Sequence, residues 1–188
     1  TSLDNGSLTP TERKDAISVI SQVGSANNLS RLFKLALKEP SILNRLVTAA
    51  QIRKLQPTEG QEQLLSFLDS KKPTVFASAA KLAGLWKFAP ARNKLVIAFT
   101  QSPAKRQAAA EGLRLFGDEE TIKLFLKLSK KSPDEATRVI ALKELAKIAP
   151  DRAAASAVAL LQKDKEGKDE QGLFTSFLQS ARASTSLA

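Results

Sequence analysis

The chain offers few of the side chains that carry out acid–base or metal chemistry. Its 188 residues contain no histidine, cysteine, methionine or tyrosine. General acid–base catalysis usually recruits His, Asp, Glu, Lys, Tyr or Cys, and His and Cys are the main protein ligands of zinc. The sequence contains neither GxxxxGK[ST] nor GxGxxG, the two common glycine-rich loops that cradle phosphates. We therefore expect a non-enzymatic protein with no catalytic residue, no metal site and no cofactor.

The carboxylates remain as possible catalytic groups, but their positions indicate a structural role. They lie at or near the expected starts of helices, where negative charge complements the helix dipole and caps free N–H groups. These residues are Glu12, Glu59, Glu62, Asp118, Glu119, Glu120, Asp134, Glu135, Asp151, Asp169 and Glu170.

The cations are distributed less evenly than the acids. Lysine and arginine total 29 against 19 acids, which gives a net charge of +10. No acid occurs between Asp69 and Glu111, a stretch that carries many cations. Four of these cations fall in expected first turns of helices, where positive charge opposes the dipole at about 0.3–1 kcal/mol per exposed site. The candidate partner-binding or anion-binding residues are Lys71, Lys72, Lys87, Arg92, Lys94, Lys105, Arg106, Lys130 and Lys131.

A repeat of 30 residues would position these cations, since Pro73, Pro103 and Pro133 follow one another at that interval. A fixed period in this range is typical of repeat architectures. Two columns align at this offset: Leu85 with Leu115 and Leu145, and Trp86 with Phe116 and Ala146. Each repeat reads as a helix, a short turn and a second helix. We interpret Trp86 as a buried plug at the end of a first helix, because its column varies in size and contains only apolar residues.

The rest of the chain extends this pattern into a single all-α domain over residues 1–188. Residues 9–70 form two divergent helix pairs and residues 73–162 three regular repeats, followed by a charged linker at 163–170 and a terminal capping helix at 171–183. One helix pair cannot bury its apolar face alone, so pairs stack on their neighbours. The pattern predicts an α-α superhelix, a solenoid of about eleven helices in stacked antiparallel pairs.

Such a stack would gather the turns between repeats along one edge. Three of these turns carry adjacent cations: Lys71 with Lys72, Lys105 with Arg106, and Lys130 with Lys131. They would form a basic ladder, with one rung per repeat about 10 Å apart, that could meet an acidic protein surface or a polyanion. The alternative is that these lysines and arginines are only solvated surface, as charged side chains commonly are.

The repeat pattern resembles a known family. In SPDEATRVIALKEL, an acidic helix start precedes Arg138, the small Ala141 and then Leu145, as in a HEAT-like repeat. The turn at residues 116–118 is similar to the turn within such a repeat. This resemblance is close over residues 73–162 and loose over 9–70. It implies a scaffold that binds a protein or peptide partner through a helical-repeat surface.

A second resemblance concerns AAKLAGLWKFAPAR, which is similar to helical-repeat segments of large haem-binding dehydrogenase-like proteins of environmental bacteria. Those proteins carry a Cys-x-x-Cys-His haem module that this sequence lacks. The resemblance implies a non-catalytic segment of a larger protein and slightly favours an extracytoplasmic, periplasmic location. The chain begins with Thr1 rather than methionine, which is also expected of an excised or processed piece.

Three functions remain open at this point. The leading one is a non-enzymatic interaction scaffold with a possibly acidic protein partner. The alternative is a nucleic-acid-binding HEAT-like protein, similar to HEAT-like DNA glycosylases, that uses its basic edge; against this, the phenylalanines follow apolar faces instead of interleaving with cations as stacking platforms do. A purely structural spacer is the third. No apolar run is long enough to insert into a membrane, and the sequence does not predict the oligomeric state.

The ladder makes a testable prediction. The chain should bind heparin or duplex DNA in a salt-sensitive manner, because contacts with polyanions release counterions. The double substitution Lys105→Glu/Arg106→Glu should weaken this retention on a heparin column. Retention that the substitution leaves unchanged would show that the ladder does not contribute to it.

Overall fold

The chain folds into helices throughout the residues that the computed structural model describes, which are 8–161, 172, 173 and 175–177. Over 8–161 there are ten α-helices and three short 3-10 helices, and no strand. The chain divides into two compact units, residues 1–94 and 95–188. The expected all-α helical-repeat fold is confirmed.

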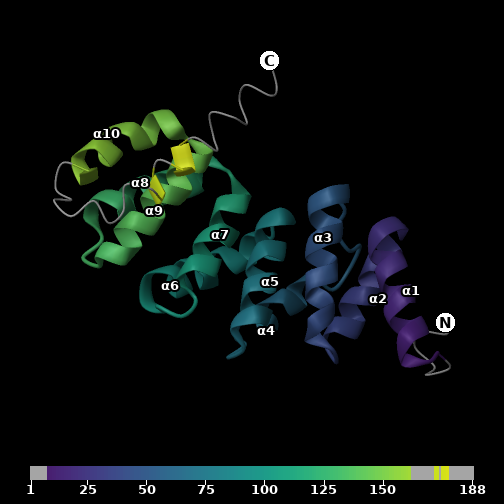
Figure 1. Ribbon diagram of the computed structural model, residues 1–188. Coiled ribbons are helices and arrows are strands. Elements are labelled where there is room, and N and C mark those ends of the chain that lie inside the picture. The colour runs from purple at the N-terminus through teal and green to yellow at the C-terminus, as the bar shows by residue number, and fades with distance from the viewer. Residues whose placement is uncertain (1–7, 162–171, 174, 178–188) are drawn as a thin grey trace, which may run out of the picture. The chain divides into compact units, whose positions relative to one another are not determined.

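Unit 1 contains the first five helices and the start of the sixth. They are α1 (Pro10–Val23), α2 (Ala26–Ala36), α3 (Leu43–Arg53), α4 (Leu64–Leu68), α5 (Pro73–Leu85) and α6 (Arg92–Gln101), with 3-10 helices at Pro40–Ile42 (η1), Gln61–Gln63 (η2) and Ala89–Ala91 (η3). The first helices of the pairs pack side by side: α1 contacts α3, and α3 contacts α5 (Figure 1). The second helices α2 and α4 pack against these first helices.

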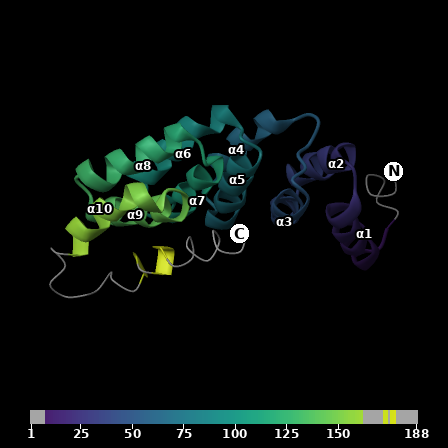
Figure 2. The same ribbon diagram turned by 90° about the horizontal axis from the view of Figure 1, so that it is seen from above.

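Unit 2 continues the same pattern with α7 (Arg106–Phe116), α8 (Glu119–Lys131), α9 (Glu135–Ile148) and α10 (Pro150–Leu161). Helix α9 contacts α7, α8 and α10, so the two pairs stack through it (Figure 2). Within unit 2, α7 with α8 and α9 with α10 follow one another as contacting helices, and the grouping of the described helices into five pairs stays a prediction. Gly117 ends α7 in the left-handed region with a φ of 61°, which places the turn of this repeat at residues 116–118 as expected.

Side-chain caps begin several helices, and they use the acids in the way that the sequence predicts. Thr9 caps α1 in a capping box: Glu12 N–H donates to Thr9 Oγ1 at 3.3 Å, and Thr9 N–H donates to Glu12 Oε2 at 2.8 Å. Asp118 caps α8 by accepting from the N–H of Thr121. Asp134 caps α9 by accepting from the N–H and hydroxyl of Thr137, and these hydrogen bonds hold the pKa of its carboxyl below the usual value.

Trp86 lies in the core of unit 1, at the end of α5. It is 7% exposed, and its ring meets Phe33 edge-on with centroids 5.5 Å apart. The indole N–H donates to the carbonyl oxygen of Leu55 at 3.2 Å, in the segment between α3 and α4. The aligned Phe116 and Ala146 are also buried, so the interpretation of this column as core filling is confirmed.

The C-terminal expectations mostly concern residues that are not described. The charged linker at 163–170 lies outside the described residues, as does most of the capping helix at 171–183. Within that helix, Leu173 is buried, and a Cβ atom on Gly172 would come within 2.7 Å of Nζ of Lys143 on α9. The division into repeat segments and terminal cap stays a prediction.

Removing the indole of Trp86 should destabilise the chain markedly. Trp86→Ala should lower the free energy of unfolding by about 3–5 kcal/mol, because it leaves a large cavity against Phe33. Trp86→Phe keeps a ring but leaves the Leu55 carbonyl without its donor, so we expect a smaller loss of roughly 1–3 kcal/mol. Urea denaturation followed by far-UV circular dichroism measures both, and near-equal, small losses would contradict a core role.

Candidate functional site

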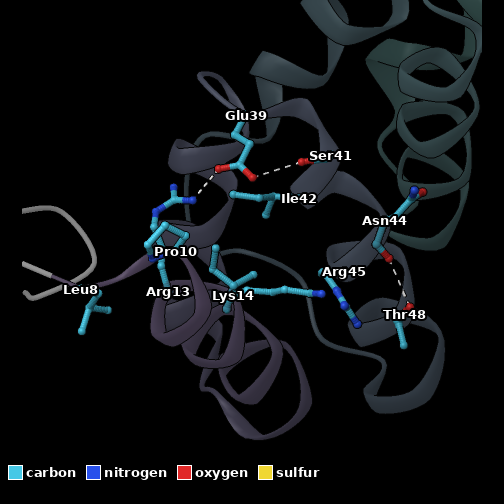
Figure 3. A pocket seen from close by; sticks show the side chains of 11 residues that line it. Leu8, Pro10, Arg13, Lys14, Glu39, Ser41, Ile42, Asn44, Arg45 and Thr48 are labelled. Atoms are coloured by element: carbon cyan, nitrogen blue, oxygen red, sulfur yellow. Dashed lines mark hydrogen bonds and ion pairs between the residues drawn. The ribbon is translucent and has the colours of Figure 1, made fainter. Parts of the chain in front are cut away.

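A groove with charged walls lies between α1 and α3 in unit 1. Its volume is about 860 Å³, and its walls come from the N-terminal halves of the two helices and from η1 (Figure 3). Helical spacing explains which side chains face it. Pro10, Arg13, Lys14 and Ile17 recur at the i, i+3, i+4, i+7 positions that share one face of a helix. Across from them, η1 and α3 contribute polar side chains and the buried Ile42.

The cations of this groove are not all engaged in the same way. Arg13 Nη1 donates to Glu39 Oε2, and the hydroxyl of Ser41 donates to the other carboxylate oxygen at 3.2 Å. Glu39, the one carboxylate lining the groove, is therefore already neutralised by Arg13. Lys14 and Arg45 are exposed and point toward one another across the groove (Figure 3). Neither pairs with a carboxylate among the described residues, so the described lining of the groove carries an excess of positive charge.

A second groove, of about 370 Å³, lies between α3 and α5. It shares Glu39, Ser41 and Asn44 with the first groove, and these residues form the wall between the two. The hydroxyl of Ser78 donates to Asn44 Oδ1 at 2.6 Å, which ties this wall to α5. The cations here are Lys38 and Lys72. Over both grooves, five cationic side chains face one carboxylate.

The candidates from the sequence occupy the turns and first turns where they were expected, and one of them reaches the grooves. Lys72 is the N-cap residue of α5 and lines the second groove, with Lys71 immediately before it. Lys94 lies in the first turn of α6 and pairs with Asp69 of the same unit at 2.5 Å. Arg92 is the first residue of α6. Lys87 follows Trp86 in the left-handed region, with a φ of 52°.

The remaining candidates lie in unit 2. Lys105 is the N-cap residue of α7, and Arg106 is its first helical residue. The Arg106 side chain is only 12% exposed; Nη1 lies 3.2 Å from Asp134 Oδ2, and Nε donates to the carbonyl oxygen of Phe99. Lys130 and Lys131 end α8. Lys130 also lines a cavity of about 660 Å³ with Glu135 and Arg138. The ladder itself, whose rungs fall in both units, stays a prediction.

Sequence reasoning missed the other groove cations, which are Arg13, Lys14, Lys38 and Arg45. A search for stretches without acids overlooks them, because Glu12, Asp15 and Glu39 stand close to them in the sequence. The fold separates the charges: Glu12 turns back to cap α1, and Asp15 does not line the groove. A search by helical face, at spacings of three and four residues, would have found Arg13 and Lys14 together.

Comparison with known proteins finds a family similarity over part of the chain. A family model for HEAT repeats matches residues 92–171, which begin with α6. The comparisons with curated proteins and with solved structures returned no match. Similarity to haem-binding dehydrogenase-like proteins therefore stays a prediction. Among the described residues, no helix is long and apolar enough to cross a membrane.

The ion pair between Arg13 and Glu39 should affect the net charge of the groove but contribute little to the free energy of unfolding. Both side chains are partly exposed, at 33% and 45%, and exposed ion pairs typically contribute about 0.2–1 kcal/mol. Glu39→Gln should therefore change the free energy of unfolding by no more than about 1 kcal/mol. Urea denaturation tests this, and a much larger loss would assign the pair a structural role.

Proposed function

Since a family model for HEAT repeats matches residues 92–171, we propose that the chain is a non-enzymatic interaction scaffold that binds an acidic protein or peptide segment across the two grooves of unit 1. HEAT repeats generally mediate protein–protein interaction. Stacked helix pairs suit this role, because each added repeat extends a continuous surface on which a partner can lie.

The observation that carries the proposal is the unbalanced charge of the grooves. Lys14, Arg45, Lys38 and Lys72 are exposed, and the one carboxylate between them is held by Arg13. Buried apolar side chains, Ile17 and Ile42, lie beneath the cations. A partner with carboxylates and short aliphatic side chains would complement both the charge and the apolar floor. Complementary charge also accelerates encounter and suppresses partners of the wrong sign.

Most of the described aromatic rings are buried, although Phe88 and Phe177 are partly exposed, and this burial supports a protein partner over a nucleic acid. Phe33, Phe76, Phe99 and Phe125 are at most 1% exposed, so they are not available as platforms on which bases could stack. Nucleic-acid binding along the basic ladder is the alternative function. It would rest on phosphate contacts alone and would therefore depend steeply on salt.

Binding of an acidic probe tests the proposal directly. We expect a fluorescent glutamate-rich peptide to bind the purified chain, with an affinity that falls as salt is added. Lys14→Glu/Arg45→Glu should weaken this binding about tenfold or more, because two attractions become repulsions. Fluorescence anisotropy gives the Kd, and far-UV circular dichroism verifies that the variant is folded.

A matched control variant distinguishes binding at the grooves from a general effect of net charge on binding. Lys123→Glu/Lys127→Glu makes the same change in charge at exposed positions of α8 that line neither groove, and should leave the Kd within about twofold. Equal losses in the two double variants would contradict a groove site. Duplex DNA is the comparison ligand: tighter binding to DNA that resists the groove variant would favour the nucleic-acid alternative.

A further inference from the structure

The two grooves of unit 1 are adjacent subsites on successive first helices. Lys14 and Arg45 flank the groove between α1 and α3, and Lys38 and Lys72 line the groove between α3 and α5. We propose that one extended segment crosses both grooves in the polyproline II conformation, placing an acidic side chain in each, three residues apart. This inference rests on the proposed function and specifies the ligand of that site.

Helix packing sets the distance between the subsites. Packed helices have axes about 8–10 Å apart, so neighbouring grooves on one layer of helices repeat at about the same interval. A segment that crosses the helices must present its acids at this spacing. A polyproline II helix has three residues per turn and rises about 3.1 Å per residue. Residues i and i+3 therefore point to the same side about 9 Å apart, which matches the grooves.

Other conformations match the interval less well. In a β-strand, side chains on one face recur every second residue, at about 6.6 Å and then about 13 Å. On an α-helix, residues i and i+3 or i+4 lie only about 5–6 Å apart at their Cβ atoms. A β-strand places no two side chains of one face at the interval of the grooves, and an α-helix comes near it only for residues i and i+7, about 10.5 Å apart, whereas polyproline II reaches it with two residues between the acids.

The wall between the subsites adds selection against acids at the wrong position. Glu39 lines both grooves, and its carboxylate is fixed by Arg13 and Ser41. Because Arg13 and Ser41 already engage this carboxylate, the wall offers no cation to an acid placed one or two residues after the first. The hydrogen bond from Ser78 to Asn44 holds the same wall against α5. The structure therefore favours neutral residues between the two acids.

Peptides of equal composition test the spacing. The first is Pro-Pro-Glu-Pro-Pro-Glu-Pro-Pro, and the second has the same residues with its glutamates adjacent, Pro-Pro-Glu-Glu-Pro-Pro-Pro-Pro. Both are labelled, and their Kd values for the full chain are measured by anisotropy at low salt. We expect the first peptide to bind at least about threefold more tightly, because only it satisfies both subsites.

Single substitutions test whether the tighter binding of the first peptide depends on both subsites. Arg45→Ala and Lys72→Ala should each remove most of the advantage of the first peptide. Arg31→Ala, at an exposed position of α2 that lines neither groove, should preserve it. Equal Kd values for the two peptides in the unaltered chain would overturn the spacing and leave the proposed function intact. If neither these peptides nor the glutamate-rich probe bind, both the spacing and the proposed function fail.

Discussion

The packing of helices against one another within each unit is the constraint on which the rest of the structure depends, and small residues are buried on the helices that pack together. Ala79, Ala80 and Ala83 of α5 are fully buried, and so are Ala109 and Ala110 of α7. Within unit 1, α5 packs against α3, and within unit 2, α7 packs against α9. A larger side chain at these positions would force the helices apart, since close-packed interiors tolerate added volume poorly. Helices packed in this way have axes about 8–10 Å apart, and the spacing proposed for the two grooves rests on this range.

The grooves are positively charged because nearby acids are engaged in helix caps and ion pairs outside them. Hydrogen bonds from Thr9 lower the pKa of Glu12, and a hydrogen bond from Lys34 lowers the pKa of Glu59. A carboxyl whose pKa is lowered by folding stabilises the fold above its unfolded pKa, and this contribution is lost as the pH falls through the folded value. At neutral pH these acids are therefore ionised and held by caps or ion pairs, while cations such as Lys14 and Arg45 have no such partner among the described residues.

The repeat architecture was predictable, because it depends on local patterns. Helix positions follow from apolar periodicity, and the turns follow from Pro73, Gly117 and the caps at Asp118 and Asp134. The grooves were not predictable from a linear scan, since they combine residues about 30 positions apart that become neighbours only when α1 packs on α3. The hydrogen-bond partners of individual side chains could also not be predicted from the sequence. Nothing in the local sequence of Trp86 indicates that its indole donates to Leu55.

Trp86 also gives the chain a built-in spectroscopic reporter. It is the one tryptophan of the sequence, which contains no tyrosine, so intrinsic indole emission arises from unit 1 alone. The ring is buried against Phe33 and bonded to Leu55, and its emission should therefore follow the loosening of three helix pairs at once. Far-UV circular dichroism follows the helices of both units. Comparing the two signals separates local opening of unit 1 from cooperative unfolding of the whole chain without any label.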